Sequence, residues 1–226
     1  MYLLALSIAP GLAIAIYIYW KDKFEKEPLH LLFLSFLLGI AATIPAILLE
    51  WLVDKLGLGS SDNNFIIGLY SFAGIALVEE ACKFFFVYRF LFHKKAFNEP
   101  FDGITYAVMV SMGFATLENV AYTFNGGLSV GVMRMFTAVP AHAVFGVVMG
   151  YFMGLAKFWP SDSNRYIGFA VLIPTLLHGL YDFSILQNGF PELRFIGAVL
   201  SLILGIILSR KAMKIHQHKS PFKPKE

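Results

Sequence analysis

LHLLFLSFLLGIAATIPAILLEWLV, residues 29–53, is an apolar run in which only His30 and Glu50 can ionise. An α-helix of roughly 20 apolar residues crosses a bilayer core about 30 Å thick, so this run predicts a transmembrane helix. The composition of the whole chain agrees, because 58% of its 226 residues are hydrophobic and only 15% are charged. Soluble domains have about 25% charged residues. The sequence therefore predicts an all-α, polytopic transmembrane helical bundle.

Apolar runs separated by short polar stretches predict about seven membrane-crossing segments. They are residues 3–20, 29–53, 65–92, 103–124, 128–156, 166–187 and 195–209, of which the last is the shortest. No repeat or long linker divides them, so residues 1–226 are predicted to form a single integral-membrane domain. Residues 210–226 would be its basic cytoplasmic tail.

The positive charges fall on one side of this arrangement. Fourteen Lys and Arg residues lie in the first, third and fifth connections and the tail, whereas the other connections hold only Lys55 and Arg194. Because cytoplasmic loops collect Lys and Arg, we expect the N-terminus outside and the C-terminus in the cytoplasm. The bilayer is the expected partner of the tail through its anionic headgroups. No nucleic-acid partner is expected, since no basic patch is interleaved with aromatic residues.

Ionisable residues inside the spans form a second pattern. A charge at the bilayer centre costs about 2.5 kcal/mol or more, so such side chains face the bundle interior and have partners. They are Glu79, Glu80, Lys83, Glu118, His142, His178 and Asp182, and Asn119 follows Glu118. At a rise of about 1.5 Å per residue, most of them fall near the midplane. Four helices are thus predicted to bring carboxylates and imidazoles to one layer.

The spacing within helices supports a site. Lys83 follows Glu80 by three residues and Glu79 by four, so its ammonium can partly neutralise either carboxylate. Asp182 follows His178 by four residues and can accept a hydrogen bond from one ring nitrogen, which leaves the other nitrogen free to act. Each pair alone could be a structural clamp, but the whole set together favours acid–base chemistry.

Other features are given simpler roles. Gly146, Gly150 and Gly154 repeat every four residues and predict the close approach of another helix. Arg134 is placed near the membrane interface, outside the chemistry, and Glu50 is expected to be solvated. His216 and His218 lie in the basic tail and are expected at the surface.

Four motifs follow one another along the chain, namely EExxK at 79–83, FxxxE at 114–118, His142 alone, and HxxxD at 178–182. Asp22…Glu25-Lys26-Glu27-Pro28 and Glu99-Pro100-Phe101-Asp102-Gly103 flank them. In this order they resemble the PrsW family of bacterial intramembrane proteases, in the superfamily of CAAX prenyl endopeptidases and bacteriocin-processing homologues. The resemblance covers about residues 1–185.

The resemblance implies a multi-pass protease of the bacterial cell membrane. It would make the first, site-1 cut in a single-pass anti-sigma factor, which leads to sigma-factor release in the envelope stress response. Its catalytic residues would be Glu79, Glu80, Glu118, His142, His178 and Asp182, supported by Lys83, Asn119 and Phe114.

Two mechanisms and two other classes of protein stay open. One of these classes is a non-catalytic membrane receptor or chaperone that binds a partner helix on the glycine-rich face, which would leave the acid–histidine set unexplained. Glu79 or Glu80 could act as a general base assisted by the histidines, or His142, His178 and Glu118 could hold zinc. No HExxH motif is present, so no cofactor is favoured and zinc is the alternative. A proton- or cation-coupled transporter would use the same cluster, although the sequence shows no inverted repeat.

Overall fold

The computed structural model describes residues 2–189 and 191–224, and within them it is helical with no strand. The helices are α1 (Tyr2–Lys21), α2 (Leu29–Asp54), α3 (Asn64–Leu69), α4 (Leu77–Phe90), α5 (Pro100–Phe136), α6 (Ala138–Phe158), α7 (Ser163–Leu186) and α8 (Pro191–His218). A π-helical stretch, Tyr70–Ala76, joins α3 to α4, and single 3-10 turns lie at Leu58–Ser60 and Pro160–Asp162.

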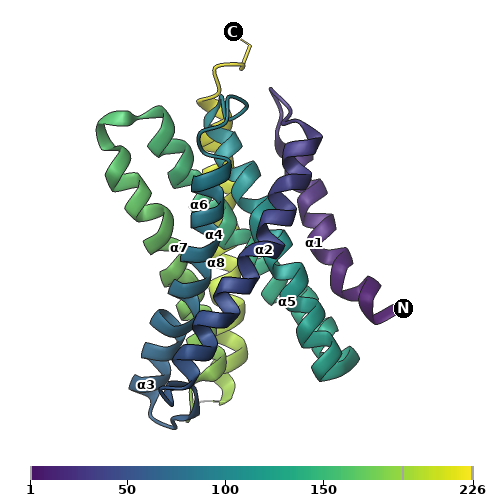
Figure 1. Ribbon diagram of the computed structural model, residues 1–226, viewed down its shortest axis with the longest axis vertical. Helices are drawn as coiled ribbons and strands as arrows, with labels where there is room; N and C mark the ends of the chain where they lie inside the picture. Colours follow the sequence, from purple (N-terminus) through teal and green to yellow (C-terminus); the bar gives the residue numbers. More distant parts are fainter. Residues whose placement is uncertain (1, 190, 225–226) are drawn as a thin grey trace.

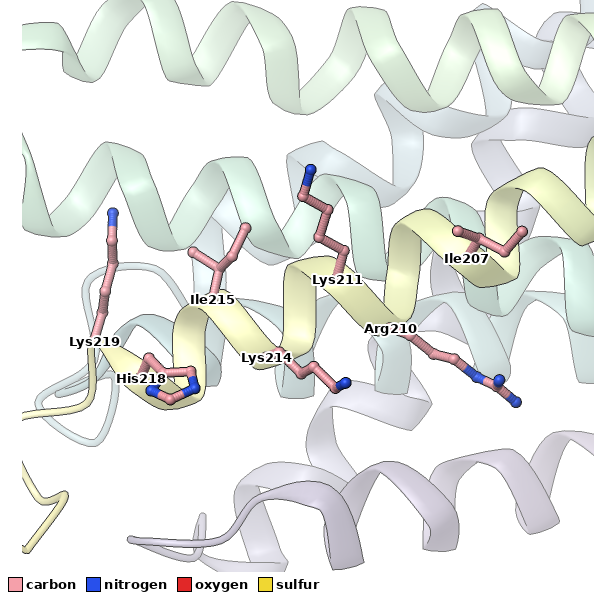
Figure 2. A pocket seen from close by; sticks show the side chains of 7 residues that line it. All are labelled: Ile207, Arg210, Lys211, Lys214, Ile215, His218 and Lys219. Carbon is pink, nitrogen blue, oxygen red and sulfur yellow. The ribbon is translucent and has the colours of Figure 1, made fainter.

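The connections α1–α2, α4–α5 and α6–α7 lie at the same end of the bundle as the C-terminus, and α3 lies at the other end (Figure 1). We call the first end the basic end, because Lys and Arg gather in its connections and in the last turns of α8. A surface pocket at this end is lined by Ile207 and Ile215 of α8 and by five basic side chains (Figure 2). Four of the five belong to α8 and one to the residue that follows it. They are Arg210, Lys211, Lys214, His218 and Lys219.

Among the described residues, six helical stretches are long and apolar enough to cross a membrane, which confirms the all-helical, multi-pass prediction. They are Tyr2–Lys21, Leu29–Asp54, Asn64–Phe90, Pro100–Phe158, Pro160–Leu186 and Ile196–His218. The longest contains α5 and α6 and reverses direction at Gly127, whose φ of 76° is not helical. Arg134 therefore lies 3.0 Å from Glu118, although 16 residues of straight helix would separate the two by about 24 Å. The number of crossings and their orientation stay predictions.

Helix α5 is the centre of the bundle. Every residue from Pro100 to Thr116 is buried, because α1, α2 and α6 pack around it. The predicted glycine stripe lies at this interface: a Cβ added to Gly150 would overlap the carbonyl oxygen of Gly103, and one on Gly154 would overlap that of Pro100. The absence of side chains here is what lets α6 approach the backbone of α5.

Helix α8 is longer than the predicted last segment and continues from Pro191 to His218. The first part of the predicted tail is therefore helical. The expectation that His216 lies at the surface is wrong: its side chain is fully buried and stacks on Tyr151 of α6, with ring centroids 4.5 Å apart. His218 is exposed, as expected. The helix continues because one of its sides still packs on α6 while its cations stay outside.

The connection between α1 and α2 carries acidic side chains that are buried. Asp22 is fully buried and Glu27 nearly so. Burial, followed by the charge of nearby carboxylates, raises the pKa of Asp22 to about 8. Burial also raises the pKa of Glu27 to about 7. These acids lie at the basic end, next to the N-terminus of α5.

Candidate active site

Side chains from four helices meet inside the bundle, as the sequence predicts. Glu79, Glu80 and Lys83 come from α4, Glu118 from α5, His142 from α6, and His178 and Asp182 from α7. The π-helical stretch just before α4 packs on α7, and a Cβ on Gly179 would overlap the ring of Phe72. This close approach brings the α4 and α7 side chains within contact distance.

Lys83 lies at the centre of the group. Its ammonium donates hydrogen bonds to Glu80 Oε1 at 2.8 Å and to Glu79 Oε2 at 3.0 Å, and it lies 3.1 Å from His142 Nδ1. It also lies 4.1 Å from the centroid of the Phe114 ring. The side chain is fully buried, so these contacts replace the water that the charge loses. Lys83 thus pairs with both glutamates.

His142 is held from both sides. Opposite Lys83, its Nε2 lies 2.8 Å from Glu118 Oε2. The same oxygen lies 3.0 Å from Arg134 Nη2. Arg134 Nε in turn donates to Asn119 Oδ1 at 3.3 Å. Our sequence interpretation placed Arg134 near the membrane interface and outside the chemistry, because it lies about six residues from the start of the predicted segment 128–156. The structure instead brings its guanidinium to the Glu118 carboxylate.

Both nitrogens of His178 face carboxylates. Nδ1 lies 3.0 Å from Glu80 Oε1, and Nε2 lies 3.3 Å from Asp182 Oδ2. Phe145 stacks on the ring with centroids 4.6 Å apart. The nitrogen expected to stay free is therefore in contact with Glu80, because α7 packs directly on α4. A ring with protons on both nitrogens can donate toward both carboxylates.

The group is buried at its centre and partly open at its edge. Glu79, Glu80, His142 and His178 are each at most 5% exposed, whereas Glu118 and Asp182 are half-buried. Glu50 is also half-buried, and its charge interacts with those of Glu79 and Glu118. The sequence interpretation treated Glu50 as solvated, although its place inside the apolar run of α2 was a signal that it faces the bundle.

The donor set suits a metal ion such as zinc. One ligand atom each from Glu79, Glu80, His142 and His178 lie within 4.8 Å of one another, and imidazole nitrogens with carboxylate oxygens are common zinc donors. Glu80 Oε2 is buried and accepts no hydrogen bond from the described residues, so it is available to a ligand. The zinc ligands expected from the sequence were His142, His178 and Glu118. In the structure, Glu79 and Glu80 take the place of Glu118 in the group of possible ligands. Lys83 contacts three of the four, and a bound cation would compete with its ammonium.

Residues 27–208 match the family described as PrsW family intramembrane metalloprotease. The chain belongs to the PrsW family. Proteins named Protease PrsW are similar over most of their length. That of Geobacillus kaustophilus is 37% identical over 82% of this chain and 80% of its own. The Bacillus subtilis protein is 34% identical over 80% of this chain and 81% of its own length. The Clostridioides difficile protein is 36% identical over 91% of this chain and 86% of its own length.

No solved structure matches the chain. Membership of the PrsW family, together with the apolar helices, makes the protein a multi-pass membrane protease of the bacterial cell membrane. The family is described as metalloproteases. This description favours a bound metal ion, whereas the sequence alone favoured a metal-free mechanism. The transporter alternative receives no support from the comparisons.

Proposed function

We propose that this PrsW family protein makes the site-1 cut in a membrane-anchored anti-sigma factor, and so leads to release of a sigma factor under envelope stress. The family resemblance supports the substrate class. The site supports the chemistry, since its carboxylates and imidazoles lie within helices apolar enough to be in the bilayer. A single-pass membrane protein can present its chain to a site at that depth.

Glu80 is the residue we assign as general base. Its Oε1 is held by Lys83 and His178, and its Oε2 is buried with no hydrogen bond. A water held by Oε2 would give its proton to the carboxylate as its oxygen attacks the scissile carbonyl carbon. The proton would then pass to the nitrogen of the leaving amine, which departs as the peptide bond breaks. Glu79 would share Lys83 and help to balance its charge.

Cationic and N–H groups around Glu80 would stabilise the developing oxyanion. Lys83 and a protonated His178 are the nearest candidates, and donors in a water-poor site are worth more than in water. Asp182 would orient His178, and Glu118 with Arg134 would orient His142. These three act through the histidines, as positioning residues.

If the family metal binds here, Glu79, Glu80, His142 and His178 would hold it. A bound zinc ion would polarise the scissile carbonyl and lower the pKa of a water molecule. The roles of this chain's own residues then shift. Lys83 would have to leave the position between the glutamates, whereas Asp182 and Glu118 would keep orienting His178 and His142 from outside.

The observation that carries the proposal is the meeting of Glu79, Glu80, His142 and His178 within 4.8 Å. The test is co-expression of a tagged anti-sigma factor with the wild type, Glu80→Gln and His178→Gln, and with the exposed control Glu192→Gln. We expect a truncated membrane fragment with the wild type and the control, and intact substrate with the two site variants at equal protein levels. Cleavage by all four proteins would contradict the assigned site.

A further inference from the structure

A second group of carboxylates lies at the basic end, away from the candidate active site. Glu25 and Glu27 come from the α1–α2 connection, and Asp102 from the first turn of α5. One carboxylate oxygen of each lies within 4.8 Å of those of the other two. Asp102 precedes Glu118 by 16 residues on α5, which corresponds to about 24 Å along the helix. The two groups are therefore separate.

Two of these carboxylates are oriented by donors on one oxygen only. Glu27 Oε2 accepts a hydrogen bond from the hydroxyl of Tyr106. Asp102 Oδ2 accepts from the backbone N–H groups of Asn98 and Glu99, each at 2.7 Å. The second oxygens, Glu27 Oε1 and Asp102 Oδ1, are buried, and no N–H or hydroxyl group of the described residues donates to them; the two carboxyl groups interact with each other. Helix capping thus accounts for the position of Asp102 Oδ2 but not for the burial of Asp102 Oδ1.

Other carboxylates near Glu27 and Asp102 also have buried oxygens without a donor. Oε2 of Glu25 is also buried without a hydrogen bond, so each of the three clustered residues has one such oxygen. Asp22 is fully buried and interacts with the carboxyl group of Glu99, and no N–H or hydroxyl group of the described residues donates to either oxygen of Asp22 or to Glu99 Oε2. Buried carboxylate oxygens are costly unless a proton, a donor or a cation satisfies them.

The nearby lysines donate their hydrogen bonds to backbone carbonyls and not to these carboxylates. Lys26 donates to the backbone carbonyls of Tyr19 and Asp22. Lys157 donates to the carbonyls of Phe92 and Lys94. In the part of the chain that the structure describes, the ion pairs involve only the candidate active site and none of these acids. The cluster therefore concentrates carboxyl groups without a paired cation among the described residues.

We propose that Glu25, Glu27 and Asp102 bind a hard divalent cation of the Mg²⁺ or Ca²⁺ class. All available donors are oxygens, which such cations prefer over nitrogen and sulfur. Tyr106 and the backbone of 98–99 orient the carboxylates from outside, as partners around metal ligands commonly do. The ion would join the α1–α2 connection to the start of α5, the central helix, and stabilise the basic end.

The test uses the full chain purified in detergent and titrated with Mn²⁺, with the free ion followed by electron paramagnetic resonance. We expect a site that Mg²⁺ or Ca²⁺ can displace, and that Glu80→Gln in the active site and the exposed Asp162→Asn both retain. Glu27→Gln and Asp102→Asn should lose it. Loss in Glu80→Gln with retention in the cluster variants would place the metal in the active site and overturn the proposal.

Glu25→Gln guards against loss of binding through misfolding, because Glu25 is half-buried and caps no helix. Removing an outer partner of a metal site costs about 10–100-fold in affinity, so losing a ligand should weaken Mn²⁺ binding at least as much. Circular dichroism should be unchanged, and Mg²⁺ or Ca²⁺ should raise the melting temperature of the wild type more than that of Glu25→Gln. A wild type that binds no Mn²⁺ at millimolar concentration would show that the carboxylates share protons instead.

Discussion

Nδ1 of His178 lies 3.0 Å from Oε1 of Glu80, although 98 residues separate the two in the chain. The same oxygen accepts a hydrogen bond from Lys83 at 2.8 Å. This oxygen therefore joins α4 to α7 and fixes how the imidazole faces the glutamate. The arrangement leaves Glu80 Oε2 as the oxygen open to water or a ligand.

His178 and Asp182 should differ in the size of their effects. His178→Gln removes a group that contacts the assigned base, and we expect cleavage to fall by about 10²–10⁴-fold. Asp182→Asn keeps the imidazole but removes its orienting charge, 3.3 Å away, and should cost about 10–100-fold. The measurement is the rate of fragment formation from a tagged substrate at matched protein levels. Equal losses would contradict a positioning role for Asp182.

Lys83→Met should destabilise the protein, because it leaves two buried glutamates without their cation. Breaking a buried ion pair from one side costs about 3–5 kcal/mol. Thermal unfolding in detergent measures the effect, and Lys211→Met on the exposed side of α8 is the control. The double variant Lys83→Met/Glu79→Gln should recover part of the loss. A single variant as stable as the wild type would refute the buried ion pair.

Lys83 should also compete with zinc at the candidate active site. Its ammonium contacts Glu79, Glu80 and His142, three of the four candidate ligands. We expect Lys83→Gln to retain more zinc than the wild type after equilibrium dialysis, as measured by elemental analysis. Adding His142→Ala to Lys83→Gln should reverse the gain. Equal zinc contents in the wild type and Lys83→Gln would show that the ammonium does not occupy the metal position.

Arg134 and Glu118 should act as one unit, since both serve to hold His142. We expect Arg134→Met and Glu118→Gln each to slow cleavage, and the double variant to be little slower than Glu118→Gln alone, because contacting residues are not additive. Arg165→Met, at an exposed position of α7, is the matched control. Additive losses would mean that Arg134 and Glu118 affect cleavage independently.

Two glycines test the packing of the bundle. Gly150→Ala puts a methyl group against the Gly103 carbonyl and should destabilise the protein by about 1–3 kcal/mol. Gly168→Ala, on a helix with open space around it, should leave stability equal or raise it by up to about 1 kcal/mol. Melting temperatures of the two variants in the same detergent give the comparison. Similar values would show that α5 and α6 do not need this close approach.

The helical, membrane-spanning architecture and a set of candidate site residues could be predicted from the sequence. Apolar runs of spanning length and the high cost of intramembrane charge are local properties, so they can be read without a structure. The layer of Glu79, Glu80, His142 and His178 follows from depth counted along separate helices, and the structure brings these four together. The motif order carried the family resemblance, which the comparisons confirm.

How these residues contact one another depends on the folded arrangement of the helices. The return of Arg134 to Glu118 depends on the reversal at Gly127, and the burial of His216 depends on α8 packing against Tyr151. The predicted segment boundary at 125–127 marked the reversal in the sequence. Which side chains then meet depends on helix rotation and long-range packing, which have no local signal. The same holds for the acidic cluster, because Glu27 and Asp102 meet only when α2 and α5 pack together.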